Sequence, residues 1–258
     1  MPPFAAQQSL FRAYDIRGSY KLFTPHFIEA LGRAFATLYT TTFNDQKDTH
    51  SKHPIIVMGY DVRCGSDRVA QGLSDILTQH GIQVIQLGLI TTPMMAFWAQ
   101  QYQGHGIVVT ASHSAKDILG IKWLVDHKSP DSRQIQSLYQ QLIINETKSR
   151  LRIQTDRPDQ YVPLQTIDSA ISQKPLDLTS EDVATAYMTA ITQVFAKIHP
   201  SDKQTDSHLP HKLDLVVVID CMHGATSTIA QRLFERFCRQ VIMLNDNHQI
   251  KLMGKMAV

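Results

Sequence analysis

The chain has 258 residues, of which 43% are hydrophobic and 19% are charged, a balance typical of a globular protein that buries one or two cores. Its net charge is +2 and the charges are mixed along the chain, so nothing predicts a nucleic-acid partner. No apolar run is long enough to predict a membrane partner, and three scattered cysteines without metal-ligand or disulfide spacing favour the cytoplasm.

Helical and strand spacings alternate along the N-terminal half of the chain. Thr24 and Pro25 predict the start of a helix, as a cap and a first-turn residue. Residues 54–58 predict a buried strand, and Ser66 predicts the cap of a helix that Gly81 ends. The next predicted elements are strand 84–87, helix 92–98, strand 107–109, strand 121–125 and helix 135–142. This alternation predicts a layered α/β domain with a mixed sheet.

We divide the chain into a first domain over residues 1–148, a linker over 149–178, and part of a second α/β domain over 179–258. The linker is polar and interrupted by prolines. Thr179 begins a capping-box pattern. The aliphatic run 213–219 is typical of a strand buried on both faces. The predicted elements here are helix 179–196, strand 213–219, helix 226–237 and strand 240–244.

Residues 106–123 carry the candidate chemistry. The first strand of this segment ends in Thr-Ala-Ser-His, small and polar residues that suit a tight turn. Ser112 is thus held at a strand end, with His113 beside it and Lys122 nearby in sequence. A hydroxyl in that position suits covalent phosphoryl chemistry. Taken alone, a serine beside a histidine is more often an ordinary turn residue, so the other motifs must decide.

This segment resembles the active-site serine loop of the phosphohexomutases, the phosphomannomutase/phosphoglucomutase family. The family pattern is Thr-Ala-Ser-His-Asn-Pro followed by Asn-Gly-Ile-Lys. Here Ser114, Ala115 and Leu119 replace the first Asn, the Pro and the second Asn, whereas Gly120 and Lys122 match. Three further motifs match the family in its order: the opening motif 11–18, the strand-to-helix turn 59–66 and the turn 88–93.

The opening motif, Phe-Arg-Ala-Tyr-Asp-Ile-Arg-Gly, places Arg17 directly before Gly18. This arrangement indicates a guanidinium presented from a turn, where it can approach a phosphate with several donors. The other interpretation is a surface arginine paired with Asp15.

The resemblance implies an isomerase, an intramolecular phosphotransferase that interconverts hexose 1-phosphate and 6-phosphate, of mannose or glucose, through a phosphoserine. It implies that Ser112 carries the phosphoryl group, and that Arg17 and Lys122 bind phosphate and stabilise charge or assist proton transfer. His113 would orient the loop or contact phosphate. Mg²⁺ would bind Ser112 through its phosphate, glucose 1,6-bisphosphate would be the activator, and a hexose phosphate would be the substrate.

The family's metal loop, Asp-Gly-Asp-Gly-Asp-Arg, has no counterpart, and Asp-Gly-Asp occurs nowhere in the chain. Transfer from a phosphoserine to an anionic sugar phosphate needs a metal and cations to offset repulsion. We therefore expect a mutase chain that is incomplete and inactive alone. The alternative is a non-catalytic remnant that binds sugar phosphate weakly or acts only as a protein-interaction fragment. An unfinished second domain would also self-associate.

Overall fold

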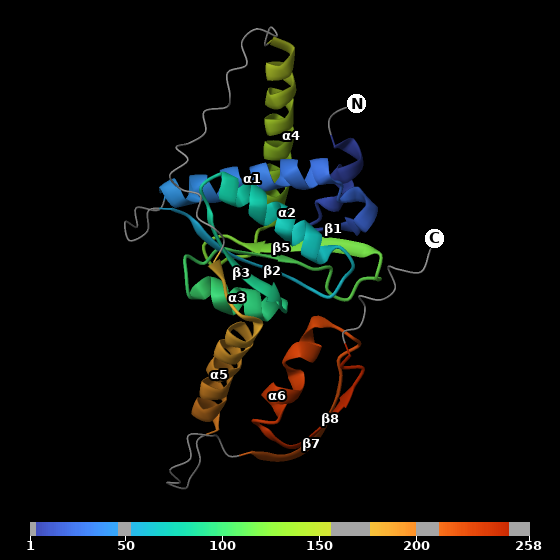
Figure 1. Cartoon of the computed structure of the whole chain (residues 1–258), viewed down its shortest axis with the longest axis vertical. Helices are drawn as coiled ribbons and strands as arrows, with labels where there is room; N and C mark the ends of the chain where they lie inside the picture. The colour runs from blue at the N-terminus through green and yellow to red at the C-terminus, as the bar shows by residue number, and fades with distance from the viewer. Residues whose placement is uncertain (1–3, 46–52, 156–175, 200–211, 248–258) are drawn as a thin grey trace.

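Helices cover both faces of a six-stranded mixed sheet, as Figure 1 shows. The computed structural model describes residues 4–45, 53–155, 176–199 and 212–247. The strand order is β1-β5-β4-β2-β3-β6; β5 is antiparallel to β1 and β4, and the remaining neighbours are parallel. The bounds are β1 Ile16–Ser19, β2 Ile55–Tyr60, β3 Gln83–Leu89, β4 Gly106–Val109, β5 Ile118–Leu124 and β6 Leu176–Asp177. The predicted α/β domain with a mixed sheet is confirmed.

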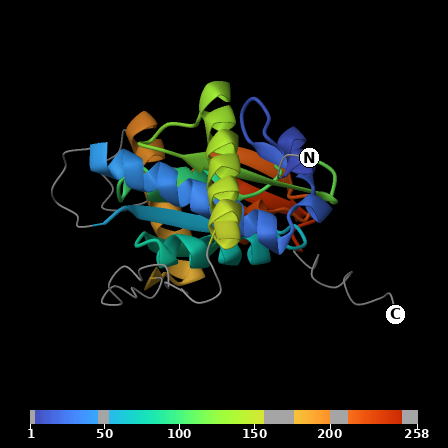
Figure 2. The ribbon, with the colours of Figure 1, turned by 90° about the horizontal axis from the view of Figure 1, so that it is seen from above.

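The core lies in two layers, one on each face of the sheet. In β2, Ile56 and Met58 pack under α1, α2 and α4, whereas Val57 between them packs toward α3 and α5, as the two-residue period of a strand requires. Figure 2 shows α4 crossing over α1 on the first face. None of the helices in the described residues is both long and apolar enough to cross a bilayer. The bounds are α1 Pro25–Asp45, α2 Ser66–Gln79, α3 Thr92–Gln100, α4 Ser132–Thr155 and α5 Ser180–Ile198, with 3-10 helices at Ala5–Leu10 and Tyr20–Leu22.

The predicted helix ends are confirmed in part. The Thr24 hydroxyl accepts a hydrogen bond from the backbone N–H of Phe27 (3.2 Å), and Gly81 follows α2 with a φ of 77°. The prediction that Ser66 caps α2 is wrong, because Gly65 occupies the cap position and Ser66 is the first helical residue. The buried Ser66 hydroxyl instead bonds the carbonyl of Asp61 at 2.6 Å, so it stabilises the turn before the helix.

A second α/β unit follows the sheet domain in the chain. The parallel strands β7 (Leu213–Asp220) and β8 (Cys238–Leu244) are joined through a 3-10 turn, Ala225–Thr228, and the short helix α6, Ala230–Phe234. The predicted helix over 226–237 is therefore wrong in length, because the helical path breaks at Ile229, whose φ is −130°.

The prediction that the strand 213–219 is buried on both faces is also wrong. The β7 side chains Leu215, Val216 and Val218 are 50%, 48% and 58% exposed. The physical reason is that β8 is the one strand partner of β7 within the described residues, so its outer side chains meet solvent. An aliphatic run shows that a strand could be buried on both faces, but burial also requires neighbouring elements that cover those faces. In β7 much of the aliphatic surface stays exposed to solvent.

The sheet, α5 and the second unit share one apolar cluster, to which the second unit contributes Ile229. The indole N–H of Trp98 in α3 donates to the carbonyl of Val183 in α5 at 3.2 Å. Met94 and Met95 of α3 belong to one apolar cluster with Val183 and Met188 of α5. The domain boundary at residue 148 stays a prediction; α4 continues past it, and β6, inside the predicted linker, pairs with β3. Residues 156–175 of that linker lie outside the described residues.

Two polar rings lie in the core and make hydrogen bonds there. The Tyr39 hydroxyl donates toward the carbonyls of Leu124 (3.1 Å) and Gly106 (3.3 Å), and burial raises its pKa. His105 Nδ1 accepts from the backbone N–H of Asp126 at 3.0 Å, and burial lowers the pKa of this ring. Burial disfavours the charged form of each ring.

Candidate active site

The loop between β4 and β5, residues 110–117 and named the serine loop below, presents Ser112 to solvent. Its backbone is in the left-handed region, with a φ of 56°, a conformation uncommon for residues other than glycine and concentrated at functional sites. The Ser112 N–H donates to the Thr110 hydroxyl at 3.0 Å, which helps to hold that conformation. The Ser112 Oγ lies 3.3 Å from His113 Nδ1, so the loop pairs an exposed hydroxyl with a group able to accept its proton.

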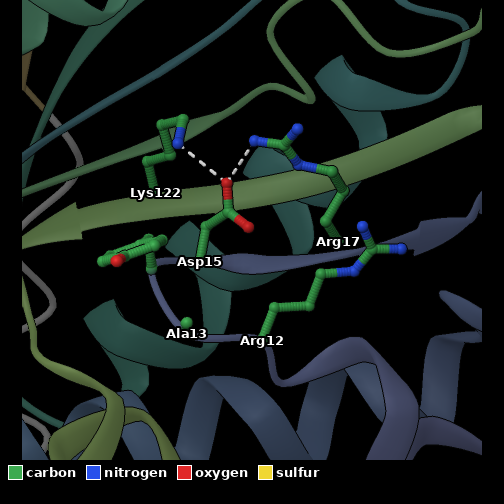
Figure 3. A pocket seen from close by; sticks show the side chains of 6 residues that line it. Arg12, Ala13, Asp15, Arg17 and Lys122 are labelled. Atoms are coloured by element: carbon green, nitrogen blue, oxygen red, sulfur yellow. Dashed lines mark hydrogen bonds and ion pairs between the residues drawn. The ribbon is translucent and has the colours of Figure 1, made fainter.

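Two cations, one on β1 and one on β5, share the carboxylate of Asp15, which directly precedes β1 (Figure 3). Lys122 Nζ is 2.7 Å from Asp15 Oδ2, and the Arg17 guanidinium contacts the same oxygen. Asp15 is buried, whereas the Lys122 side chain is 27% exposed and that of Arg17 16%. Two cations therefore share one anion, which leaves the group with a net positive charge.

The register of β1 and β5 explains how these cations meet. Arg17 lies directly opposite Gly120, and Lys122 is two residues farther along β5 on the same face. The prediction that Arg17 is presented from a turn is wrong, because it lies within β1. The pairing with Asp15 is present, but Asp15 is buried and shared with Lys122 rather than lying on the surface.

An open pocket with a volume of about 330 Å³ adjoins this triad (Figure 3). Its walls are formed by Arg12, Ala13, Tyr14, Asp15, Arg17 and Lys122. The opening motif thus supplies five of the lining residues and β5 the sixth. Three of the six are cations and one is an anion, so the pocket suits an anionic group such as a phosphate.

The structure brings the predicted residues together as two adjacent groups. One group is Ser112 with His113, and the other is Arg17 with Lys122. Arg17 Nη1 donates to the Ser114 hydroxyl at 3.2 Å, which joins the two groups. Among hydrogen bonds of the described residues, none links the Ser112 hydroxyl directly to Arg17 or Lys122. Ser114, which departs from the family pattern, supplies the hydroxyl at this junction.

Arg63 is the residue to which we assigned no role from the sequence. Its guanidinium donates to four carbonyls of the serine loop and its far end: Ser112 (2.8 Å), Ser114 (2.5 Å), Ala115 (2.6 Å) and Ile118 (2.9 Å). Its Nε lies 3.3 Å from Asp61 Oδ2. The available signal was the Gly-x-Asp-x-Arg pattern at the carboxyl end of β2, a central strand, which places a carboxylate and a guanidinium two residues apart.

The described residues do not form a metal site. No group of three His, Cys, Asp or Glu side chains among them could hold a metal ion. Asp15 is engaged by Arg17 and Lys122, and Asp61 by Arg63, so these two carboxylates are already paired with cations. The magnesium implied by the resemblance therefore does not fit these residues, apart from the Ser112 hydroxyl itself.

Known proteins share both the sequence pattern and the fold. Residues 8–149, more than half of the chain, match the family model described as phosphoglucomutase/phosphomannomutase, alpha/beta/alpha domain I. A phosphoglucosamine mutase from Caldanaerobacter subterraneus subsp. tengcongensis is 30% identical over 237 residues, which are 90% of this chain and 44% of that protein. A phosphomannomutase/phosphoglucomutase from Pseudomonas syringae pv. tomato is 27% identical over 92% of this chain and 41% of that protein.

A solved structure extends this likeness to three dimensions. The phosphoglucomutase/phosphomannomutase family protein from Burkholderia thailandensis superposes with a TM-score of 0.64 at 25% identity, covering 93% of this chain and 44% of that one. The chain thus spans less than half the length of these relatives. The matched residues 8–149 contain the serine loop, the opening motif and Lys122, which shares Asp15 with Arg17. The chain belongs to the phosphoglucomutase/phosphomannomutase family.

Proposed function

We propose that this chain carries the phosphoserine half of a hexose-phosphate mutase, in which Ser112 accepts a phosphoryl group from a sugar phosphate and returns it. The observation that carries the proposal is the exposed Ser112 hydroxyl, held in a left-handed turn 3.3 Å from His113 Nδ1. The relatives are named for glucosamine, mannose and glucose phosphates. We therefore propose the substrate class, an aldohexose 1- or 6-phosphate, with mannose and glucose as the first sugars to test.

The chemistry follows from the groups present. Ser112 Oγ attacks phosphorus, the new Oγ–P bond forms, and the bond from phosphorus to the sugar oxygen breaks. The serine proton passes to His113 Nδ1, and the departing sugar oxygen takes up a proton from water. Asp15 neutralises one of the two cations, Arg17 and Lys122, so one net positive charge remains. That charge offsets part of the negative charge of the phosphates. To isomerise a hexose monophosphate, the phosphoserine transfers its phosphoryl group to the free hydroxyl of that sugar and gives a hexose bisphosphate. Ser112 then takes the other phosphoryl group from the bisphosphate by the step above, which leaves the isomeric monophosphate.

A complete catalytic cycle needs groups that the described residues do not provide. Two phosphorylated species carry several negative charges, and the described residues hold no metal cluster to offset them. We propose that the chain alone is inactive in turnover and that magnesium takes its protein ligands from outside the described residues. The free cysteines Cys64, Cys221 and Cys238 support a cytoplasmic location.

A second candidate function is a non-catalytic protein that binds sugar phosphate weakly or contacts other proteins. The observation that favours it is that the described residues form a cationic pocket but no group that could hold a metal ion. In this case the pocket would retain phosphate binding through Arg17 and Lys122, and Ser112 would stay unmodified. The two candidates differ in one event, the covalent transfer to Ser112.

The deciding prediction is that Ser112 accepts one phosphate. Purified protein incubated with glucose 1,6-bisphosphate and magnesium is expected to gain one phosphate in its intact mass. The variant Ser112→Ala is expected to gain none, because it lacks the acceptor oxygen. Ser137→Ala, which removes an exposed hydroxyl from α4, is the matched control and should gain phosphate as the native chain does. A folded native chain that gains no phosphate would establish the second candidate instead.

Exposed apolar side chains of the second unit predict that two copies of the chain associate. Leu215 and Val218 on β7 and Ile242 and Leu244 on β8 are 50%, 58%, 41% and 46% exposed, and the strands are flanked by free edges within the described residues. Such surfaces drive pairing between molecules. Sedimentation over a concentration series is expected to show dimers that Val218→Lys suppresses.

The matched control for this experiment is Gln140→Lys, which adds the same charge to an exposed position of α4. It should leave the association unchanged, because α4 lies on the opposite side of the sheet domain from the second unit (Figure 1). A native chain that sediments as a monomer at all concentrations and melts in one sharp transition would contradict the prediction.

A further inference from the structure

Arg63 contacts the serine loop at more points than any of the residues predicted to do chemistry. One guanidinium nitrogen donates to the carbonyls of Ser112 and Ser114, and the other to those of Ala115 and Ile118. These carbonyls span the loop from the candidate phosphoryl acceptor to the first residue of β5. A single side chain thus ties both ends of the loop to one point.

The guanidinium of Arg63 is itself fixed. Its Nε lies 3.3 Å from Asp61 Oδ2, and the Arg63 backbone N–H donates to Asp61 Oδ1 at 2.9 Å. Both side chains are only 11% exposed, and Asp61 follows directly on β2 in the sheet. The Asp61 N–H in turn donates to the carbonyl of Val109, the last residue of β4. The loop is therefore anchored to two neighbouring strands through one ion pair.

Only an arginine can make this set of contacts. Its planar fork carries five N–H donors in fixed directions, whereas the lysine ammonium is a compact point charge with three donors. Because Asp61 offsets its charge and the carbonyls occupy its donors, Arg63 is not free to bind a ligand. Its contacts determine the geometry of the loop instead.

We infer that Arg63 is a positioning residue that holds Ser112 in its left-handed conformation and so aims the hydroxyl at the incoming phosphorus. That Arg63 holds the conformation of Ser112 follows from the contacts within the loop alone. That this conformation promotes phosphoryl transfer to Ser112 rests on the proposed function. The strain of a φ of 56° at a serine persists only where the surroundings impose it. The Arg63 contact to the Ser112 carbonyl and the Thr110 contact to its N–H are those constraints.

The test compares native protein, Arg63→Lys and Arg63→Ala in two measurements. The first is amide hydrogen exchange of the peptide covering residues 110–119, which needs no substrate. We expect exchange in this peptide to be about tenfold faster in both variants, with the remaining peptides unchanged. The second is the rate of Ser112 phosphorylation by glucose 1,6-bisphosphate, which we expect to fall about 100-fold, the effect of a displacement near 1 Å.

Chemical rescue separates positioning from general stability. Guanidinium ion added to Arg63→Ala is expected to restore slow loop exchange and part of the phosphorylation rate, whereas methylammonium, with the same charge, should restore neither. Arg33→Lys is the matched control, because Arg33 pairs with Glu29 on the surface of α1 and does not contact the loop. If Arg63→Ala does not fold, Arg63→Lys carries both measurements.

The outcomes distinguish the two proposals. Loop exchange in Arg63→Lys equal to that of native protein would overturn the positioning role. Native protein that exchanges slowly in the loop but accepts no phosphate would remove the proposed function while the exchange comparison still decides the role of Arg63. Faster loop exchange with an unchanged phosphorylation rate would overturn the claim that this conformation aims the hydroxyl.

Discussion

Replacing Asp15 by alanine is expected to lower the free energy of unfolding by about 3 kcal/mol, and to slow phosphorylation of Ser112 about 100-fold. The stability falls because the buried Asp15 carboxylate accepts charged hydrogen bonds from Arg17 and Lys122. The rate falls because the two cations, no longer held together, repel each other. Urea unfolding and the intact-mass time course measure the two effects.

The control for this prediction is Asp15→Asn. Asparagine keeps an oxygen acceptor of the same size but removes the charge, so it separates the hydrogen bonds from the ion pairs. We expect its stability to lie between those of native protein and Asp15→Ala. Unfolding midpoints for Asp15→Ala within experimental error of native protein would show that Asp15 is not the link between the cations.

The sheet domain could be predicted from the sequence because its elements carry strong local signals. The strand 54–58 is nearly all apolar, and the prediction matches β2 over most of its length. Gly81 ends α2 as predicted, since glycine accommodates a φ of 77° without strain. In these segments the conformation that the local sequence prefers is also the one that tertiary packing requires. The local sequence alone therefore predicts the element correctly.

The second unit was predicted less well because its signals depend on neighbours. The apolar residues of β7 match a fully buried strand, yet burial depends on which elements cover it. The helix predicted through residue 237 breaks into a 3-10 turn and one short helix, because the chain must reach β8 beside β7. The helical spacing of apolar residues shows that a segment could form an amphipathic helix. It does not show where the chain must turn to reach the next strand.

The candidate site shows the same division between local and long-range information. Ser112, His113, Arg17 and Lys122 could be named because each lies in a short motif. The carboxylate shared by Arg17 and Lys122 joins residues more than 100 positions apart and follows from the register of β1 against β5. The four carbonyls bound by Arg63 are invisible in sequence, because backbone groups carry no residue identity. Long-range backbone contacts are therefore the part of this site that needed the structure.

Gly120→Ala is expected to lower the free energy of unfolding by about 3 kcal/mol and to slow the phosphorylation of Ser112. A methyl group at this position would lie 2.7 Å from the carbonyl oxygen of Thr110 and 2.8 Å from that of Ile16. Both are backbone atoms, so neither can rotate away, and Thr110 is the start of the serine loop. The added carbon must therefore push β1 or the loop out of place. Thermal unfolding and the intact-mass time course measure the result.

The matched control is Gly72→Ala in α2. There the added carbon would meet only a side-chain methyl group of Ile28, at 3.0 Å, which can shift by a small rotation. Alanine also favours the helix by up to about 1 kcal/mol, so we expect little net change in stability and none in the phosphorylation rate. Equal losses in the two variants would show that the effect of Gly120→Ala is one of general packing. A loss confined to Gly120→Ala would mean that the serine loop owes its position to the absence of a side chain on the neighbouring strand.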